Sequence, residues 1–252
     1  MRAMRRGRAL LMWTALLLGL FGAAVADAAL VAIDPVKVLL TGAAPSKSIS
    51  LRNNGSERVR FQMSGFTWQQ SIGGEMQLAP TPDLVFFPSL VELAPGETRR
   101  VRVTTTQQVA SNERSYRLFV DELPPLAAQP GGAIRVLTRF GIPVFLAPDA
   151  AAAKPLLRLA VQAGKLSVSL ENRGNSHYVA QSVRLVGRSA DGSSVLSQDL
   201  PAWYVLAGGR REYQLPLAPE VCSKLTQVSA NANTDHGSAR LDYPVPSSAC
   251  TP

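Results

Sequence analysis

Residues 48–64 read SISLRNNGSERVRFQMS, two runs of alternating apolar and polar residues on either side of an Asn-Asn-Gly turn. Alternation with a period of two predicts β-strands that bury one face, and turn residues between two such runs are typical of antiparallel neighbours. The same alternation returns around Val101, Leu118 and Leu170, with proline and glycine between the runs. The sequence therefore predicts an all-β protein built of antiparallel sandwiches.

One strand of this region departs from simple alternation. Phe61 and Met63 share one parity, but after Gly65 the apolar positions are Phe66 and Trp68, which have the other. A β-bulge at a glycine produces such a change of phase. We therefore expect a bulge at Gly65.

The sharpest change in composition is at residues 147–155, which read APDAAAAKP. A short helix is one interpretation, but the flanking prolines favour a linker between domains. The strand pattern resumes beyond this segment, and each side has the length of an ordinary immunoglobulin-like sandwich. We expect an N-terminal domain over residues 29–148 and a C-terminal domain over residues 149–252.

The first residues have the composition of a secretory signal peptide. Several arginines precede an apolar run over residues 10–21, and small residues follow as far as Ala28. The run is shorter than the ~20 residues that span a bilayer, which disfavours a membrane anchor. We expect residues 1–28 to be a signal peptide and the remaining chain to be exported to the periplasm, without stable membrane insertion.

Composition excludes several classes of protein. The chain has 252 residues, of which 46% are hydrophobic and 17% charged, unlike a disordered polyelectrolyte. Its net charge of +8 is scattered and not concentrated in a stripe with stacking aromatics, so we expect no nucleic-acid partner. Cys222 and Cys250 are the two cysteines, and an oxidising compartment favours a disulfide between them.

The sequence offers no pattern of catalytic chemistry. His177 and His236 are far apart, neither lies in a metal-ligand spacing, and there is no phosphate-binding or nucleophile motif. Asp121 and Glu122 are neighbours in an expected strand, so their side chains point to opposite faces. We therefore expect no enzyme activity, no catalytic residue, no metal and no cofactor.

Ten segments carry a resemblance to a known family. They are residues 33–38, 53–55, 61–68, 80–83, 87–88, 93–96, 101–103, 116–118, 122–124 and 139–145. In order and spacing they resemble the periplasmic pilus chaperones of the chaperone–usher pathway, the PapD-like family. The Arg-Phe-Gly-Ile-Pro run at residues 139–143 is similar to the archaic-type branch. The C-terminal part resembles the family only in length and strand pattern.

The resemblance implies two immunoglobulin-like β-sandwich domains in an L or boomerang arrangement. It implies a chaperone that binds a pilus subunit lacking its last strand, lends it a strand by donor-strand complementation and delivers it to an outer-membrane usher. The alternatives left open by the residues are an exported immunoglobulin-like adhesin or pilus component, and a secreted hydrolase on a sandwich scaffold.

Family position also implies which residues would form the donor strand. They are Ile134, Val136, Thr138 and Phe140. On a free sheet edge, such a row offers side chains together with unpaired N–H and C=O groups. The alternative is that these residues face the protein's own core, as most alternating strand residues do.

A second implied feature is a basic anchor for the carboxylate at the subunit's C-terminus. Lys37 occupies the place of the family's first-strand cation, whereas the second cation falls on Pro143. Arg117 and Arg139 are the substitutes that we expect, and the alternative for each is a solvated sheet face. We assign four other aromatic residues to cores or domain contacts: Trp68, Phe86, Phe87 and Trp203.

Overall fold

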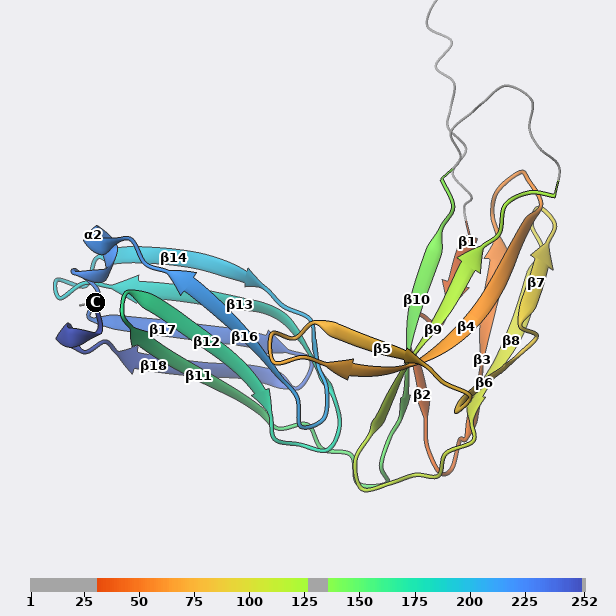
Figure 1. The fold of residues 1–252 in the computed structure, drawn as a ribbon, viewed down its shortest axis with the longest axis horizontal. Helices are drawn as coiled ribbons and strands as arrows, with labels where there is room; N and C mark the ends of the chain where they lie inside the picture. The colour runs from red at the N-terminus through yellow and green to blue at the C-terminus, as the bar shows by residue number, and fades with distance from the viewer. Residues whose placement is uncertain (1–30, 127–135, 251–252) are drawn as a thin grey trace, which may run out of the picture.

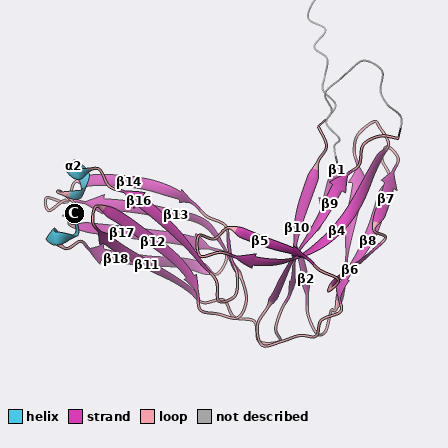
Figure 2. Cartoon of the chain, in the orientation of Figure 1, coloured by secondary structure: helices cyan, strands magenta, loops and turns pink. Residues whose placement is uncertain are grey.

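The computed structural model describes residues 31–126 and 136–250. Nearly all of the regular structure is β-strand (Figure 2), and the strands form two sandwiches that meet at an angle, in the outline of an L (Figure 1). The predicted all-β class and the two immunoglobulin-like sandwiches are confirmed. No helix within the described ranges is long and apolar enough to cross a membrane.

The first sandwich consists of strands β1 to β10. Their bounds are β1 (Val31–Asp34), β2 (Val38–Leu40), β3 (Ser46–Asn53), β4 (Val59–Gln70), β5 (Met76–Pro80), β6 (Leu84–Phe87), β7 (Leu90–Leu93), β8 (Thr98–Thr105), β9 (Arg114–Glu122) and β10 (Arg139–Leu146). One sheet has the order β1-β3-β8-β6, and the other has the order β2-β10-β9-β4-β5, with β7 also paired to β4.

The core of this sandwich follows from the alternation in its strands. Ile49 and Leu51 of β3 are fully buried, as are Leu118 and Val120 of β9. Burying a side chain of this size contributes about 1.5–3 kcal/mol relative to leaving it exposed. The polar residues between them face outward, so the apolar faces of the two sheets hold the sandwich together.

The chain's first two strands lie in different sheets, and this leaves part of β10 uncovered. β1 pairs with β3, whereas β2 pairs with β10 only at Val144, Phe145 and Leu146. Residues 139–143 of β10 therefore pair with β9 on one side and, among the described strands, with none on the other. We call residues 139–143 the free edge of β10. Backbone groups on such an edge are available to another chain.

The change of phase at Gly65 has a different cause from the bulge that we expected. The pairing of β4 with β9 continues through Gly65 without a register shift, so the predicted bulge is wrong. Phe66 and Trp68 lie on the outer face of the sheet, and Trp68 is buried there by the second sandwich. Gly65 itself faces the core, where a Cβ would come within 3.1 Å of the Phe86 ring.

The second sandwich contains the remaining strands and two short helices. Their bounds are β11 (Pro155–Gln162), β12 (Lys165–Asn172), β13 (Tyr178–Arg188), β14 (Ser194–Pro201), β15 (Tyr204–Val205), β16 (Arg210–Pro216), α2 (Pro219–Cys222), β17 (Gln227–Thr234), β18 (Gly237–Pro244) and the 3-10 helix η1 (Ser247–Cys250). One sheet has the order β11-β12-β16, and the other β14-β13-β17-β18, with β15 also paired to β13.

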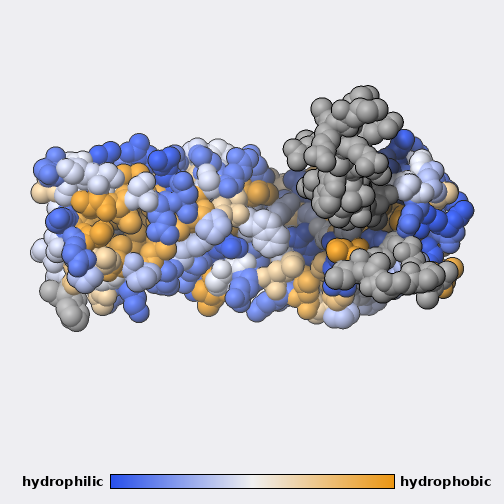
Figure 3. All heavy atoms as spheres, turned by 90° about the horizontal axis from the view of Figure 1, so that it is seen from above, coloured by the Kyte–Doolittle hydropathy of each residue, from blue (hydrophilic) through white to orange (hydrophobic). Residues whose placement is uncertain are grey.

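Apolar side chains are visible on one side of this second sandwich (Figure 3). Val195 and Leu196 of β14 and Leu215 of β16 are partly buried and pack against its core. Because β14 and β16 are the outermost strands of their sheets, these residues form the rim of the core.

The segment between the sandwiches, residues 147–154, contains no helix, so the linker interpretation describes it better. Asn175 holds it: its Oδ1 accepts the Ala152 N–H at 2.8 Å, and its Nδ2 donates to the Ala150 carbonyl at 3.1 Å. No residue with a side chain fits at the neighbouring position 174, because a Cβ on Gly174 would lie 2.0 Å from the Ala152 carbonyl oxygen.

The predicted disulfide between Cys222 and Cys250 is present, with Cα atoms 5.6 Å apart. It joins the end of α2 to η1 and closes a loop of 28 residues in sequence separation. In the loop-entropy description, such a link stabilises a domain by about 3 kcal/mol.

The double variant Cys222→Ala/Cys250→Ala is expected to lower the free energy of unfolding of the second sandwich by about 3 kcal/mol. Urea denaturation followed by circular dichroism would measure the loss. Dithiothreitol should cause a similar loss in the unchanged protein and none in the double variant. Equal denaturation midpoints for the oxidised protein and the variant would contradict this expectation.

Candidate functional site in the cleft between the sandwiches

A small apolar cluster joins the two sandwiches. Trp68 of β4 and Phe145 of β10 are buried in it together with Leu206 of the second sandwich, and Trp203 and Tyr204 pack against them. The aromatic rings lie within van der Waals range of one another, with 5.3 Å between the ring centroids of Trp68 and Trp203. Both sandwiches therefore contribute to one aromatic cluster at their junction, and Trp68 and Leu206 of this cluster also line the pocket between the sandwiches.

A buried polar pair fixes the angle between the sandwiches. Oε1 of Glu113, next to β9, lies 2.8 Å from Nδ1 of His177 in the second sandwich, and both side chains are buried. The His177 ring stacks on Phe145 with 3.6 Å between ring centroids. The Glu113 N–H also donates to the Asn175 carbonyl at 2.8 Å. The elbow is thus a packed interface.

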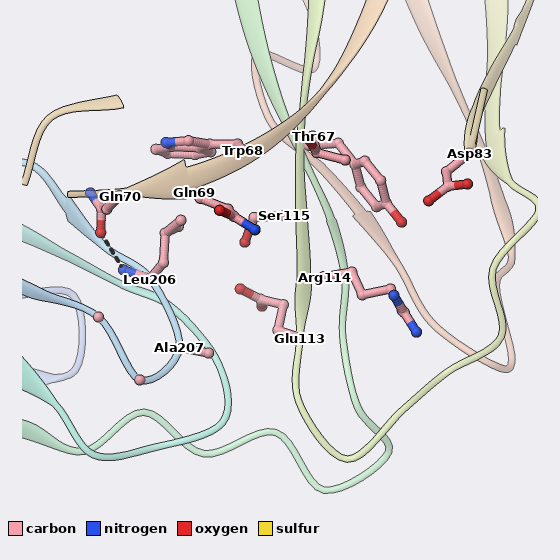
Figure 4. A pocket seen from close by; sticks show the side chains of 13 residues that line it. Thr67, Trp68, Gln69, Gln70, Asp83, Glu113, Arg114, Ser115, Leu206 and Ala207 are labelled. Atoms are coloured by element: carbon pink, nitrogen blue, oxygen red, sulfur yellow. Dashed lines mark hydrogen bonds between the residues drawn. The ribbon is translucent and has the colours of Figure 1, made fainter. Parts of the chain in front are cut away.

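The β4–β5 hairpin reaches out of the first sandwich to the second (Figure 1). At the end of β4, next to the turn of the hairpin, Gln70 Nε2 donates to the Tyr204 carbonyl at 2.7 Å. Gln70 Oε1 accepts the Leu206 N–H at 2.9 Å (Figure 4). The carboxamide binds this backbone as a neighbouring strand would. At the tip, Arg211 donates to the Gly74 carbonyl at 3.2 Å.

Gln70→Leu is expected to loosen the elbow, because it leaves the Tyr204 carbonyl and the Leu206 N–H without their partner. The loss should be about 1–3 kcal/mol in unfolding free energy. Small-angle X-ray scattering should show a larger radius of gyration, and the melting temperature should fall. Gln69→Leu changes the exposed neighbour and is the matched control. Unchanged scattering and melting in Gln70→Leu would contradict the role of this contact.

Arg117 of β9 is the buried cation of the cleft. It lies on the outer face of its sheet, opposite Pro143 of β10, and is only 5% exposed. Its Cζ lies 4.1 Å from the ring centroid of Trp68 and 4.9 Å from that of Trp203. Cation–π contacts of this kind contribute about 0.5–2 kcal/mol each. Among the described residues, none forms an ion pair with Arg117.

One edge of the Arg117 guanidinium has no hydrogen-bond partner. Nη1 donates to the Gly141 carbonyl at 2.9 Å, whereas Nε and Nη2 are buried and donate to no atom of the described residues. Nε–H and Nη2–H form the fork with which arginine binds both oxygens of one carboxylate. We call this pair the fork of Arg117. Because an unpaired buried donor costs about 1–3 kcal/mol, the fork is suited to an acceptor from outside the protein.

The electrostatics of the cluster agree with this interpretation. Burial lowers the pKa of the Arg117 guanidinium, and Tyr204 opposes this effect, but arginine stays charged at neutral pH. Burial raises the pKa of the Tyr204 hydroxyl, which therefore stays neutral. The indole Nε1 of Trp68 is another buried donor without a partner. The cluster thus combines one positive charge with several unpaired N–H groups.

Lys37 lies in the same row across the sheet as Arg117. β2 starts with Val38 opposite Val144, and continuing this parallel register by one residue places Lys37 opposite Pro143, which is itself opposite Arg117. Two strand spacings put the Lys37 and Arg117 backbones about 10 Å apart. Lys37 is exposed. Two of the three predicted anchor residues thus lie in or next to the strands on either side of β10, Arg117 buried and Lys37 exposed.

Arg139, the third predicted anchor residue, is placed differently. It lies at the start of β10, about 13 Å along the strand from Pro143. Its Nη2 donates to Asp121 Oδ2 at 3.2 Å, and its Nε donates to Asp121 Oδ1. Its Cζ lies 5.0 Å from the ring centroid of Phe119. Arg139 already has a carboxylate partner and is exposed to solvent.

The four predicted donor residues have different surroundings. Ile134 lies outside the described residues, and Val136 is 78% exposed. Thr138 is half-buried, just before the start of β10. Phe140 packs against the core of its own sandwich, as the alternative interpretation expected. Of the described donor candidates, Val136 is the apolar side chain most available to a partner.

The aromatic assignments also have different outcomes. Phe86 packs against the core of the first sandwich, and Trp68 and Trp203 form contacts between the sandwiches, as predicted. Phe87 is 78% exposed, so assigning it to a core or a domain contact is wrong. The reason is that neighbours in a strand point to opposite faces, and β6 has a core on one face only.

The first sandwich matches a known family. Residues 30–152 match the family described as "Pili and flagellar-assembly chaperone, PapD N-terminal domain". Residues 30–152 belong to this chaperone family. The assignment of this chain to the archaic-type branch of the family stays a prediction. No curated protein matches the sequence significantly.

Solved structures of pilus chaperones share the fold of both sandwiches. A chain in the Acinetobacter baumannii CsuC–CsuE complex, a pre-assembly complex of a chaperone and a tip adhesion subunit from archaic chaperone–usher pili, is 20% identical with a TM-score of 0.61. The alignment covers 86% of this chain and 100% of that chain. The E. coli chaperone DraB is 15% identical with a TM-score of 0.55, over 86% of this chain and 99% of DraB.

A third similar structure is the Salmonella enterica SafA pilin in complex with the SafB chaperone. One of its chains is 16% identical with a TM-score of 0.52, over 86% of this chaperone and 99% of that chain. At these identities the likeness concerns the fold, and it extends beyond residues 30–152 into the second sandwich.

Proposed function

We propose that the protein is a periplasmic, non-enzymatic chaperone that binds pilus subunits by donor-strand complementation and delivers them to an outer-membrane usher. Residues 1–28 would direct its export, and residues 29–148 and 149–252 would fold as its two domains. This role needs no cofactor and no metal, because binding energy alone stabilises the subunit.

The observation that carries this proposal is the free fork of Arg117 at the elbow end of the free edge of β10. A subunit that lacks a strand would pair with this edge, and its terminal carboxylate would enter the fork, with Lys37 as the second cation. Charge-assisted hydrogen bonds of this kind are roughly twice as strong as neutral ones. Ile134, Val136 and Thr138 would enter the subunit's groove, where an apolar side chain contributes about 1.5–3 kcal/mol. Arg139, paired with Asp121, would lie at the far end of the edge.

Co-expression tests the proposal directly. A tagged form of the protein would be produced with a small exported pilus subunit encoded beside an usher gene, and purified from the periplasm. The expected result is a one-to-one complex, with little soluble subunit when the chaperone is absent. Equal amounts of soluble subunit with and without the chaperone would overturn the proposal.

We infer a separate surface for the usher on the side of the first sandwich away from the cleft. Phe87 and Val85 are exposed on the same face of β6, and Leu90 is exposed at the start of β7. Phe87 lies opposite Arg102 of β8. Exposed apolar side chains beside a cation are typical of a protein-binding site. Val85 and Phe87 of β6 lie on the other sheet from β10, whereas Leu90 lies in β7, which pairs with β4. Because β6 belongs to the other sheet, Phe87 would stay accessible when a subunit pairs with the free edge of β10.

Phe87→Ser is expected to reduce pilus assembly at least ~10-fold, a change of about 1.4 kcal/mol, while the subunit still co-purifies. The stability of the chaperone should change by no more than about 0.5 kcal/mol, since the side chain is exposed. Leu126→Ser alters a similarly exposed residue and is the control. Normal pilus numbers in the Phe87 variant would remove this surface from the usher contact.

A further inference from the structure

The fork of Arg117 is closed in this structure. Its Nε and Nη2 atoms are buried, and the side chains over them are aromatic. Trp68 belongs to the first sandwich, whereas Trp203 and Tyr204 belong to the second. Because both atoms of the fork are buried, a carboxylate can reach them only if a neighbouring group moves, and these rings are neighbours of the guanidinium.

Trp203 is the ring with the greatest freedom to move. Trp68 is 2% exposed, and Tyr204 is part of β15, which pairs with β13. Trp203 is partly exposed and lies in the short connection between β14 and β15. Its carbonyl accepts the Ala180 N–H at 3.0 Å, so the backbone is held, whereas the partly exposed ring is held by packing on Trp68 and Tyr204.

The surroundings of the fork also restrict which residue can accompany the carboxylate. Glu113 Oε1 and His177 Nδ1 lie 2.8 Å apart and are each other's partners, and the Tyr204 hydroxyl is neutral. Among the described residues, Arg117 is therefore the cation of the aromatic cluster that keeps unpaired donors for a ligand. A charged side chain next to the entering carboxylate would lose its hydration without gaining a partner, and such burial is costly.

We propose that Trp203 is a specificity-determining residue for the C-terminal residue of the cargo. Its indole leaves the fork when the carboxylate enters and then packs on the side chain of that last residue. The site therefore selects chains that end in an apolar or aromatic residue. This inference rests on the proposed function, because it takes Arg117 as the anchor of a chain terminus.

Peptides of eight residues that differ only at their last position would test the selection. They would end in phenylalanine, leucine, aspartate or lysine, and one would end in phenylalanine amide. Calorimetric titration of the exported protein would give each dissociation constant. The Phe and Leu peptides are expected to bind at least ~10-fold more tightly than the Asp and Lys peptides, a difference of about 1.4 kcal/mol. In Trp203→Ala this difference should nearly disappear.

Tryptophan fluorescence adds a structural readout. Trp13 lies in the expected leader, so Trp68 and Trp203 are the two indoles of the exported chain. Binding of the Phe peptide should change the emission of the unchanged protein and of Trp68→Phe, because both retain Trp203. If Trp203→Ala fails to fold, Trp203→Leu decides the test, since it keeps apolar volume but removes the ring. It should reduce the preference for the Phe peptide over the Asp and Lys peptides, because the ring on which the last residue packs is absent.

The outcomes separate this inference from the proposed anchor. If the amide peptide binds as tightly as the free acid and Arg117→Gln has no effect, the anchor itself is wrong. If carboxylate binding depends on Arg117 but the last residue does not matter, or Trp203→Ala keeps the preference, the anchor stands and the role of Trp203 is overturned.

Discussion

Replacing Arg117 with methionine is expected to abolish the capture of pilus subunits while making the free protein more stable. The guanidinium is a buried charge with an unpaired fork. Replacing a buried ion pair with apolar side chains of similar volume is often neutral or stabilising, by about 1–4 kcal/mol. We expect the same direction for this buried, unpaired cation, reduced by the loss of its contacts with the Trp68 and Trp203 rings. Removing one partner of a buried charge pair costs about 2–5 kcal/mol in binding, so the dissociation constant should rise at least ~30-fold.

Thermal unfolding and subunit co-purification would measure the two effects of Arg117→Met. The melting temperature should rise by about 2–4 °C for each kcal/mol gained. Arg139→Met is the matched control, because Arg139 is exposed and already paired with Asp121. It should leave both stability and capture nearly unchanged. A less stable Arg117→Met that still binds subunits would show that the cation has a structural role only.

Val136→Asp is the second substitution with a large expected effect. In the proposed complex Val136 enters the apolar groove of the subunit, where a carboxylate would be buried without a partner. A buried unpaired charge costs about 3–5 kcal/mol, so subunit recovery should fall by at least ~100-fold. The fold should not change, because Val136 is 78% exposed. Purification from the periplasm and circular dichroism would check the two statements.

Leu137→Asp is the control for this experiment. Leu137 is the next residue, is 43% exposed and has the opposite parity, so it would point away from the groove. Its effect on recovery should be at least tenfold smaller, about 1.4 kcal/mol less in binding. Equal recovery of the subunit with Val136→Asp and with the unchanged protein would mean that this segment is not the lent strand.

The fold could be predicted from period-two alternation because one face of each strand is buried. Alternation assigns residues such as Ile49 and Leu118 to a common face, but it does not say what covers the other face. For this reason Trp68 suggested a bulge, whereas in the structure it marks the place where a second sandwich covers the sheet. The same limit explains Phe87, which is apolar but faces away from the only core beside it.

The site was harder to predict because its geometry depends on both sandwiches. The family resemblance predicted Arg117 as an anchor residue. Nothing in the sequence indicates that two of its N–H groups are unpaired or that the Trp203 ring packs on its guanidinium. Gln70 and the pair of Glu113 and His177 have no sequence signal at all. Their partners are distant in the chain and meet only when the two domains pack.

The shortness of β2 has a consequence for how such proteins evolve. β2 pairs with three residues of β10, and residues 139–143 have no second partner among the described strands. If an insertion before Val38 lengthened β2 by a few residues, the longer strand would pair with residues 139–143 of β10. The first domain would then be a sandwich without this open edge. The length of β2 thus decides whether this edge can bind another chain. We expect selection to keep β2 short.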